Sequence, residues 1–165
     1  MTLRHARHED LPAIVAILNQ SAGTGANALL APVSTASREA WLAEHTPDRQ
    51  PVWVAESGGA LLGWCSLSGW RSGRGALAGV REISYYVDAA HYRQGVATAL
   101  VRHAVATCPG LAVHTLLAIG LETNSASEAL LAREGFVRWG LLPAIAHLDR
   151  QPEKVTGQWI YGRHL

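Results

Sequence analysis

Residues 83–100 read ISYYVDAAHYRQGVATAL, and this segment is the most informative part of the chain. The apolar and aromatic run Ile83–Val87 is typical of a strand, and the small and apolar residues from Gly95 onward predict the start of a helix. Small residues at Gly95 and Ala97 leave the amides of the first helical turn uncovered, at the positive end of the helix dipole. The segment therefore predicts a helix start that binds phosphate, to which Arg93 adds charge. The alternative is that Gly95 only begins a packed helix.

The neighbouring segments alternate between strand-like and helical patterns. Before the central segment we expect a strand at residues 2–6, a helix at 11–19, a second helix at 38–44 with Ser37 as N-cap, and a hairpin of strands 52–55 and 61–67 around Ser57-Gly58-Gly59. From there on we expect a strand at 81–87, a helix at 95–106, a strand at 112–121, a helix at 125–133, and strands at 136–142 and 158–163. The order β-α-α-β-β-β-α-β-α-β-β, without an internal repeat or a linker, predicts one mixed α/β domain over residues 1–165.

Composition excludes several classes of function. The 165 residues are 48% hydrophobic and 16% charged, with a net charge of +1, so the chain can bury a core and is not disordered. A near-neutral balance without a Lys/Arg run predicts no nucleic-acid partner and no membrane-surface partner. The apolar stretches all fall short of the roughly 18 residues that a membrane-spanning helix needs. Residues 1–8 do not resemble a secretory signal, so we expect a cytoplasmic location.

Other catalytic and metal-binding patterns are missing from the sequence. Cys65 and Cys108 have neither metal-type nor disulfide-type spacing, and we expect both to be reduced residues in or near the core. The histidines show no repeated ligand spacing, so we predict no metal. A G-x-S-x-G elbow and the G-x-G-x-x-G and G-x-x-x-x-G-K-[ST] phosphate loops are all missing, so a phosphate-bearing cofactor of another kind is expected.

The central segment resembles the acetyl-CoA-binding motif of the GNAT N-acetyltransferases, Q/R-x-x-G-x-G/A, which here reads Tyr92-Arg93-Gln94-Gly95-Val96-Ala97. A second motif resembles the family's N-x-x-S-x-x-L pattern followed by G-F, and here reads Asn124-Ser125-Ala126-Ser127-Glu128-Ala129-Leu130 and then Gly135-Phe136. Over residues 2–142 the chain most resembles the phosphinothricin and methionine sulfoximine acetyltransferase group. Arg38 with Ala40-Trp41 also lies where that group has similar residues.

This resemblance implies a GNAT fold of the α/β (α+β) class, with a mixed central β-sheet flanked by helices. It implies an enzyme that moves acetyl directly from acetyl-CoA to the primary amine of a small molecule, an amino acid or analogue, and that forms a homodimer. The residues carried over to acetyl-CoA are Tyr85, Tyr86 and Val87 for the acetyl and pantetheine portion, Arg93, Gln94, Gly95, Val96, Ala97, Thr98 and Ala99 for the pyrophosphate, and Asn124 for the pantetheine arm.

The resemblance also suggests how the reaction is catalysed. Glu82 matches a glutamate of the group at the start of the central strand, and it is the candidate general base, acting directly or through water. The alternative is a surface glutamate held in a salt bridge. The backbone N–H of Tyr86 or Val87 would polarise the thioester carbonyl if the strand bulges there, as it does in the family.

The chain departs from the group at the residue expected to protonate the leaving thiolate. Family members place a tyrosine or histidine there, whereas this chain has Leu131. A water or a nearby Tyr or Ser could supply the proton instead, or CoA could leave as the thiolate. Tyr92-Arg93 is a second departure, since the family prefers Arg or Gln followed by Gly.

The acceptor-binding segment departs as well. The group has an aromatic–arginine pair where this chain has Leu77-Ala78, and Arg71 or Arg74 could replace that arginine by bidentate contact with a carboxylate. Among the tryptophans we expect Trp70 to line the acceptor pocket. These departures keep two other functions open, an acyl-CoA-binding regulatory module with little activity and N-acetylation of a protein or peptide.

Overall fold

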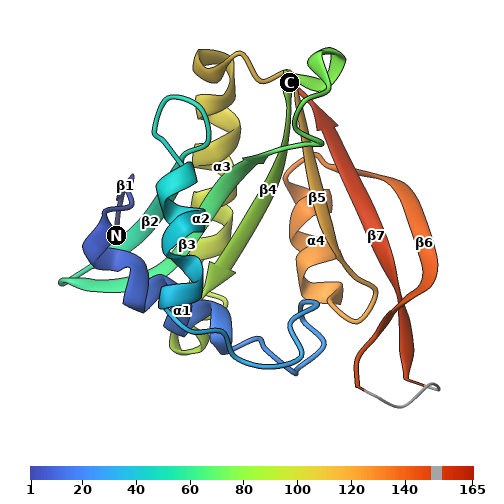
Figure 1. Ribbon diagram of the computed structural model, residues 1–165, viewed down its shortest axis with the longest axis horizontal. Helices are drawn as coiled ribbons and strands as arrows, with labels where there is room; N and C mark the ends of the chain where they lie inside the picture. Colours follow the sequence, from blue (N-terminus) through green and yellow to red (C-terminus); the bar gives the residue numbers. More distant parts are fainter. Residues whose placement is uncertain (150–153) are drawn as a thin grey trace.

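A seven-stranded mixed β-sheet forms the centre of the molecule (Figure 1). The computed structural model describes residues 1–149 and 154–165. The strands are β1 (Thr2–His5), β2 (Val52–Ser57), β3 (Ala60–Gly69), β4 (Val80–Val87), β5 (Thr115–Leu121), β6 (Val137–His147) and β7 (Val155–His164). Their order across the sheet is β1-β2-β3-β4-β5-β7-β6. Only β4 and β5 pair in parallel among the described strands.

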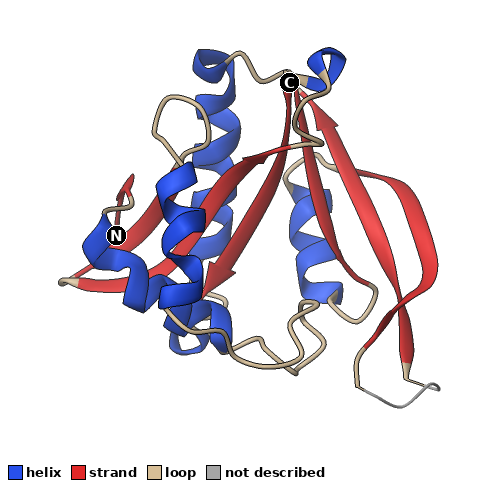
Figure 2. Ribbon diagram, in the orientation of Figure 1, coloured by secondary structure: helices blue, strands red, loops and turns tan. Residues whose placement is uncertain are grey.

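Helices cover both faces of the sheet (Figure 2). They are α1 (Leu11–Asn19), α2 (Glu39–Glu44), α3 (Val96–Thr107) and α4 (Ser125–Arg133). One buried cluster packs the side chains of α3 and α4 against the sheet, and a second packs those of α1 and α2 against the opposite face. Successive side chains of β2 point to opposite faces of the sheet, as the period of two in a strand requires. Trp53 therefore belongs to the first cluster and Val54 to the second.

The predicted element order and fold class are confirmed. The β2–β3 hairpin turns through Gly58 and Gly59, whose φ angles of 58° and 79° are the two positive values that a type I′ turn needs. Helix α4 has the predicted bounds, and Gly135 after it takes a φ of 79°, as a helix-ending glycine commonly does. Cys65 and Cys108 are free and buried, as expected.

Three details differ from the sequence expectation. Ser37 does not cap α2, because its Oγ donates to the carbonyl of Ser34 in a preceding 3-10 turn, and α2 begins only at Glu39. Strand β5 begins at Thr115, because the chain passes through another 3-10 turn and a left-handed residue first. Strands β6 and β7 are longer than predicted, since β6 absorbs Pro143 within an irregularity between Leu142 and Ala146.

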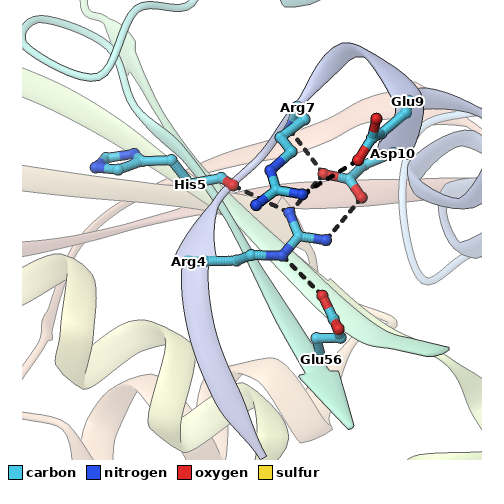
Figure 3. A network of polar contacts seen from close by, with 6 residues as sticks. All are labelled: Arg4, His5, Arg7, Glu9, Asp10 and Glu56. Atoms are coloured by element: carbon cyan, nitrogen blue, oxygen red, sulfur yellow. Dashed lines mark hydrogen bonds and ion pairs between the residues drawn. The ribbon is translucent and has the colours of Figure 1, made fainter. Parts of the chain in front are cut away.

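A partly buried ionic network fixes β1 to the start of α1 (Figure 3). Arg4 donates from Nη1 and Nη2 to the two carboxylate oxygens of Asp10, over 2.7 and 2.9 Å, and from Nε to Glu56 of β2 over 2.7 Å. Asp10 also accepts the backbone N–H of Arg7 at 2.7 Å. Hydrogen bonds from Arg4 hold the pKa of the Asp10 carboxyl below its usual range. The network therefore holds the start of α1 against β1 and β2.

Candidate active site

Strands β4 and β5 part halfway along their length, and this opening defines the site. Their parallel pairing covers Val80–Glu82 of β4 and Thr115–Leu117 of β5, and stops there. On its other side β4 stays paired with β3 from Arg81 to Val87, in one continuous register over the described residues. The conditional expectation of a bulge at Tyr86 or Val87 is therefore not met, and the divergence of two strands opens the sheet instead.

The alternation of strand hydrogen bonds decides which backbone groups of β4 face this opening. The Asp88 N–H donates to the Leu62 carbonyl at 2.9 Å, so the even-numbered residues of β4 turn their backbone groups toward β3. The backbone groups of Tyr85 and Val87 therefore point toward the opening, where no described strand pairs with them. The N–H of Tyr86, which the sequence offered as an oxyanion donor, instead belongs to the β3 ladder.

A cavity of about 230 Å³ occupies the opening between β4 and β5. Its lining comes from β4, β5, β7, the start of α4 and the loop before α2. Four of the predicted site residues line it, namely Glu82, Tyr85, Tyr86 and Asn124. The opening therefore brings together the candidate base, the free edge of β4 and the second sequence motif.

Glu82 is partly buried and lines this cavity. Burial raises the pKa of its carboxyl above the usual range, because a charged carboxylate loses solvation there. Among the described residues Glu82 has no ion-pair partner. The salt-bridge alternative therefore has no support from the contacts, and the carboxylate is a stronger base than an exposed glutamate.

The start of α3 forms a cradle of backbone amides. Gly95 is the N-cap and takes a left-handed φ of 82°, and Arg93 two residues earlier has a φ of 60°. An added Cβ at Gly95 would meet no described atom within 4 Å, so the position needs glycine for its backbone angle and leaves open space above the helix end. The amide of Ala99 donates to Gly95 at 2.9 Å, whereas those of Val96, Ala97 and Thr98 have no backbone acceptor in the described chain.

Asn124 joins α4 to the loop before α2. Its side-chain oxygen accepts the N–H of Ser127 at 3.2 Å and so caps α4. Its Nδ2 donates to the carbonyl of Ala26 at 2.8 Å, and Thr123 Oγ1 donates to that of Gly25 at 2.5 Å. Both polar groups of the Asn124 amide therefore already have protein partners.

Leu131 is fully buried in the core cluster under α3 and α4, and it has no proton to donate. The hydroxyl of Tyr85 reaches across the opening instead and lies 2.5 Å from Ser127 Oγ. Both residues line the cavity. Burial raises the pKa of Tyr85 to about 12, so its hydroxyl stays protonated at neutral pH.

A second cavity, of about 280 Å³, lies between the sheet and the helices α1 and α2. Its walls are mostly apolar and include Trp41 and Trp64, while Ser66, Ser68 and Ser84 add hydroxyls from β3 and β4. Arg38 contributes the only charged side chain among its described lining residues. This cavity shares four residues with the first, Asn27, Ala28, Ser84 and Tyr86, so the two meet over the middle of β4.

Three residues that the sequence suggested for acceptor binding lie outside the lining of both cavities. Trp70, Arg71 and Arg74 lie in the segment between β3 and β4, and none of them is among the described residues that line the two cavities. Arg71 and Arg74 are exposed. The sequence reasoning missed Arg38 and Trp41 as lining residues, and their one signal was their likeness to the related group. Among the tryptophans that could line the acceptor pocket it preferred Trp70, whereas the structure places Trp64 there.

The arrangement fits acetyl-CoA. Uncovered amides at the start of α3 suit a pyrophosphate, and the unpaired edge of β4 suits an arm that carries amide groups of its own. Residues 1–149 and 154–165 contain no group of three or more potential metal ligands and no helix that is both long and apolar enough to span a bilayer.

Comparison with known proteins gives the same result. Residues 1–137 match the family model described as an acetyltransferase (GNAT) domain. A Bacillus subtilis (strain 168) protein, provisionally named phosphinothricin acetyltransferase YwnH, is 37% identical over 162 residues, 96% of this chain and 98% of that protein. The L-methionine sulfoximine/L-methionine sulfone acetyltransferase of Pseudomonas paraeruginosa is 32% identical over 87% of this chain and 84% of its own length.

A solved structure shows the same fold together with acetyl-CoA. It is a GNAT superfamily phosphinothricin acetyltransferase from Sinorhizobium meliloti in complex with acetyl-CoA. The match spans 99% of this chain and 88% of that protein, with 26% sequence identity and a TM-score of 0.89. The divergent strands, the amide cradle and these comparisons agree, and the chain belongs to the GNAT acetyltransferase family, whose acyl donor is acetyl-CoA.

Proposed function

We propose that this chain transfers the acetyl group of acetyl-CoA to the primary amine of a small molecule, an amino acid or an amino-acid analogue. The observation that carries this proposal is the meeting of the two cavities at Ser84 and Tyr86. A donor along the free edge of β4 and an acceptor beneath α1 and α2 would meet there, beside Glu82. The relatives named as phosphinothricin and methionine sulfoximine acetyltransferases support an amino-acid-like acceptor.

Transfer is direct, without an acyl-enzyme. The neutral amine attacks the acetyl carbon and a C–N bond forms. The C–S bond then breaks, the nitrogen loses its second proton to water, and CoA leaves as a thiolate that takes up a proton. Glu82 accepts the proton that the acceptor ammonium must lose, directly or through one water, and its raised pKa favours this role. The backbone N–H of Tyr85 or Val87, on the unpaired edge of β4, stabilises the developing oxyanion.

The proton for the leaving thiolate comes from the Tyr85–Ser127 pair in this proposal. Whichever hydroxyl donates within the pair, the other keeps a hydrogen for an acceptor in the cavity. The pair thereby replaces the donor that Leu131 cannot provide, and water returns the proton that the pair gives up. The amides of Gln94–Thr98 and the Arg93 side chain would hold the pyrophosphate, while Ala99 closes the helical turn beneath it.

The test measures CoA release with amino acids, L-methionine sulfoximine, phosphinothricin, polyamines and short peptides as acceptors. Glu82→Gln removes the base, so we expect kcat to fall about 10²- to 10⁴-fold while the acetyl-CoA Kd stays unchanged. Because a base must be deprotonated, the wild-type kcat should rise with pH as Glu82 loses its proton, around its raised pKa. This rise of kcat with pH should be missing in Glu82→Gln. Glu44→Gln, on the exposed end of α2, is the matched control.

Three results would contradict the assignment in different ways. Equal losses of kcat and acetyl-CoA binding in Glu82→Gln would remove Glu82 as the base. Acetyl-CoA binding by the wild type without CoA release from any amine would favour the regulatory module. Acetylation of peptides alone would favour a protein or peptide N-acetyltransferase.

We further propose a homodimer in the cytoplasm. Support for the homodimer comes from the apolar side chains that β6 exposes at the edge of the sheet. Support for the location comes from the two free thiols, which are typical of a reducing compartment.

A further inference from the structure

Arg38 lies at the wall of the cavity beside α1 and α2 and forms no ion pair with the described residues. Its Nε is buried and has no hydrogen-bond partner. Nor does any described carboxylate form an ion pair with its guanidinium. By contrast, Arg4, Arg7, Arg102 and Arg138 each pair with an acidic side chain.

The Arg38 side chain is half-buried, and it lines the cavity together with Ile14, Leu18 and Trp41. The side chains of Ile14 and Leu18 have no polar group that could accept a hydrogen bond from the guanidinium. Tyr86 lines the same cavity as Arg38 and lies where the two cavities meet. Burial raises the pKa of Tyr86, and a hydrogen bond with Asn27 and the positive charge of Arg38 act against that increase. A ligand that brings its own carboxylate would supply the missing partner, in a fork geometry that arginine matches.

The polar groups of the cavity floor complement the other end of such a ligand. Ser66 pairs with Ser84 and Ser68 with Glu82 across β3 and β4, so three hydroxyl side chains and the candidate base lie on the same face of the sheet, two on each strand. His45 donates from Nδ1 to the Trp41 carbonyl at 2.6 Å, so its Nε2 accepts the hydroxyl hydrogen of Ser68 at 3.0 Å. The Ser68 oxygen therefore keeps lone pairs for a donor such as an ammonium group.

We propose that Arg38 binds the α-carboxylate of the acceptor, and that the enzyme therefore requires a free carboxylate next to the amine that it acetylates. This inference rests on the proposed function and assigns one end of its acceptor. The apolar walls between Trp41 and Trp64 then take the acceptor's side chain. Arg71 and Arg74, the arginines that the sequence suggested for this contact, are exposed and outside both cavities.

The experiment compares amino acids with the same molecules lacking the carboxylate. The pairs are L-methionine sulfone with 3-(methylsulfonyl)propan-1-amine, and L-leucine with 3-methylbutan-1-amine. For each pair, kcat/KM is measured by CoA release, and Kd by calorimetry on protein saturated with CoA, which needs no turnover. The variants are Arg38→Gln, Arg38→Lys, Arg71→Gln and Arg74→Gln, and Arg133→Gln, an exposed arginine of α4, is the matched control.

We expect the wild type to prefer at least one carboxylated compound over its partner amine. Arg38→Gln should reduce that preference about 10- to 100-fold, mainly through KM and Kd, with acetyl-CoA affinity and thermal unfolding unchanged. Arg38→Lys should recover part of it, since charge returns without the fork geometry. The other variants should keep the wild-type preference.

Other results would overturn the inference. One is an equal loss of kcat/KM for the amino acid and for its partner amine in Arg38→Gln. Another is a variant pattern in which only Arg71→Gln or Arg74→Gln loses the preference for the carboxylated compound. A wild type that binds neither carboxylated compound more tightly than its partner would also overturn it. Calorimetry separates this failure from failure of the proposed function, since carboxylate binding without CoA release contradicts the transfer reaction and leaves the role of Arg38 intact.

Discussion

Tyr85 and Ser127 show how two hydroxyls from distant parts of the chain come to serve one cavity. Tyr85 belongs to β4 and Ser127 to the first turn of α4, and their oxygens lie 2.5 Å apart across the opening of the sheet. The Tyr85 ring packs against the same core cluster that contains Leu131. The pair thus offers a hydroxyl donor in this chain, which has Leu131 where the resemblance implies a tyrosine or histidine.

Tyr85→Phe tests this pair. We expect kcat to fall about 10- to 100-fold, because the leaving thiolate loses a positioned proton source, while the acetyl-CoA Kd stays within about twofold. Ser127→Ala should cost less, since Tyr85 keeps its hydrogen. With a pKa of about 12, Tyr85 keeps its proton as pH rises. Loss of that proton should therefore cause no fall of the wild-type kcat below about pH 11.

The measurement is steady-state CoA release over a pH series, with calorimetry for acetyl-CoA. Tyr161→Phe provides the control. The Tyr161 hydroxyl contacts Glu128 at 3.4 Å, and Tyr161 is not among the residues that line either cavity. An unchanged kcat in Tyr85→Phe would assign the proton to water, and a loss confined to acetyl-CoA affinity would make Tyr85 a binding residue only.

Among the helices, α3 begins with the proposed pyrophosphate site, which depends on one glycine. The left-handed φ of Gly95 turns the chain into the helix without a side chain over the amides of Val96, Ala97 and Thr98. Asp88 fixes the approach to this turn, since its carboxylate accepts the Ala90 N–H at 2.8 Å and a Gln20 amide hydrogen at 3.1 Å. The cradle is thus tied to the end of β4 on one side and to α1 on the other.

Gly95→Glu should abolish acetyl-CoA binding, because a carboxylate over the helix start occupies the place of the pyrophosphate and repels it. Gly95→Ala is the matched control: it carries the same backbone strain, about 1–2 kcal/mol for a left-handed residue with a Cβ, but no charge. Calorimetry with acetyl-CoA and with CoA distinguishes the two effects. Similar affinities in both variants would mean that strain, and no anion site, explains the loss.

At the scale of the whole molecule, β6 leaves one edge of the sheet uncovered. Large apolar side chains gather there, and the exposed ones are Val137, Trp139, Leu141, Leu142 and Ile145. An exposed apolar edge strand is a template for another chain, and natural proteins commonly cover such a surface. A second copy of the chain would cover it in the proposed homodimer.

Light scattering should therefore give the mass of two chains for the wild type. Ile145→Asp should shift the mass toward one chain, because a carboxylate in the middle of an apolar interface is costly to desolvate. Leu30→Asp is the control, since Leu30 is equally exposed, 54% against 53%, but lies outside β6. A single-chain mass for the wild type would contradict the homodimer.

Most of the fold could be predicted from local patterns. The glycine pair of the β2–β3 turn, the helical spacing of α1 and α3, and the glycine that ends α4 all act over a few residues, so the sequence indicates them directly. Predictions failed where distant contacts decide. The pairing of β6 with β7 extends both strands, since each supplies backbone partners that no local pattern reveals.

The family, the amide cradle before α3 and the candidate base could be inferred from the sequence, because each rests on residues close together in the chain. The cavity beside α1 and α2 and the hydroxyl pair became visible only in the folded molecule. Arg38 lines one cavity with Ser84 and Tyr86 of β4 because α2 packs on the sheet, and Tyr85 reaches Ser127 where β4 and β5 diverge. Such contacts join residues tens of positions apart, and their geometry depends on packing over the whole sheet rather than on any segment alone.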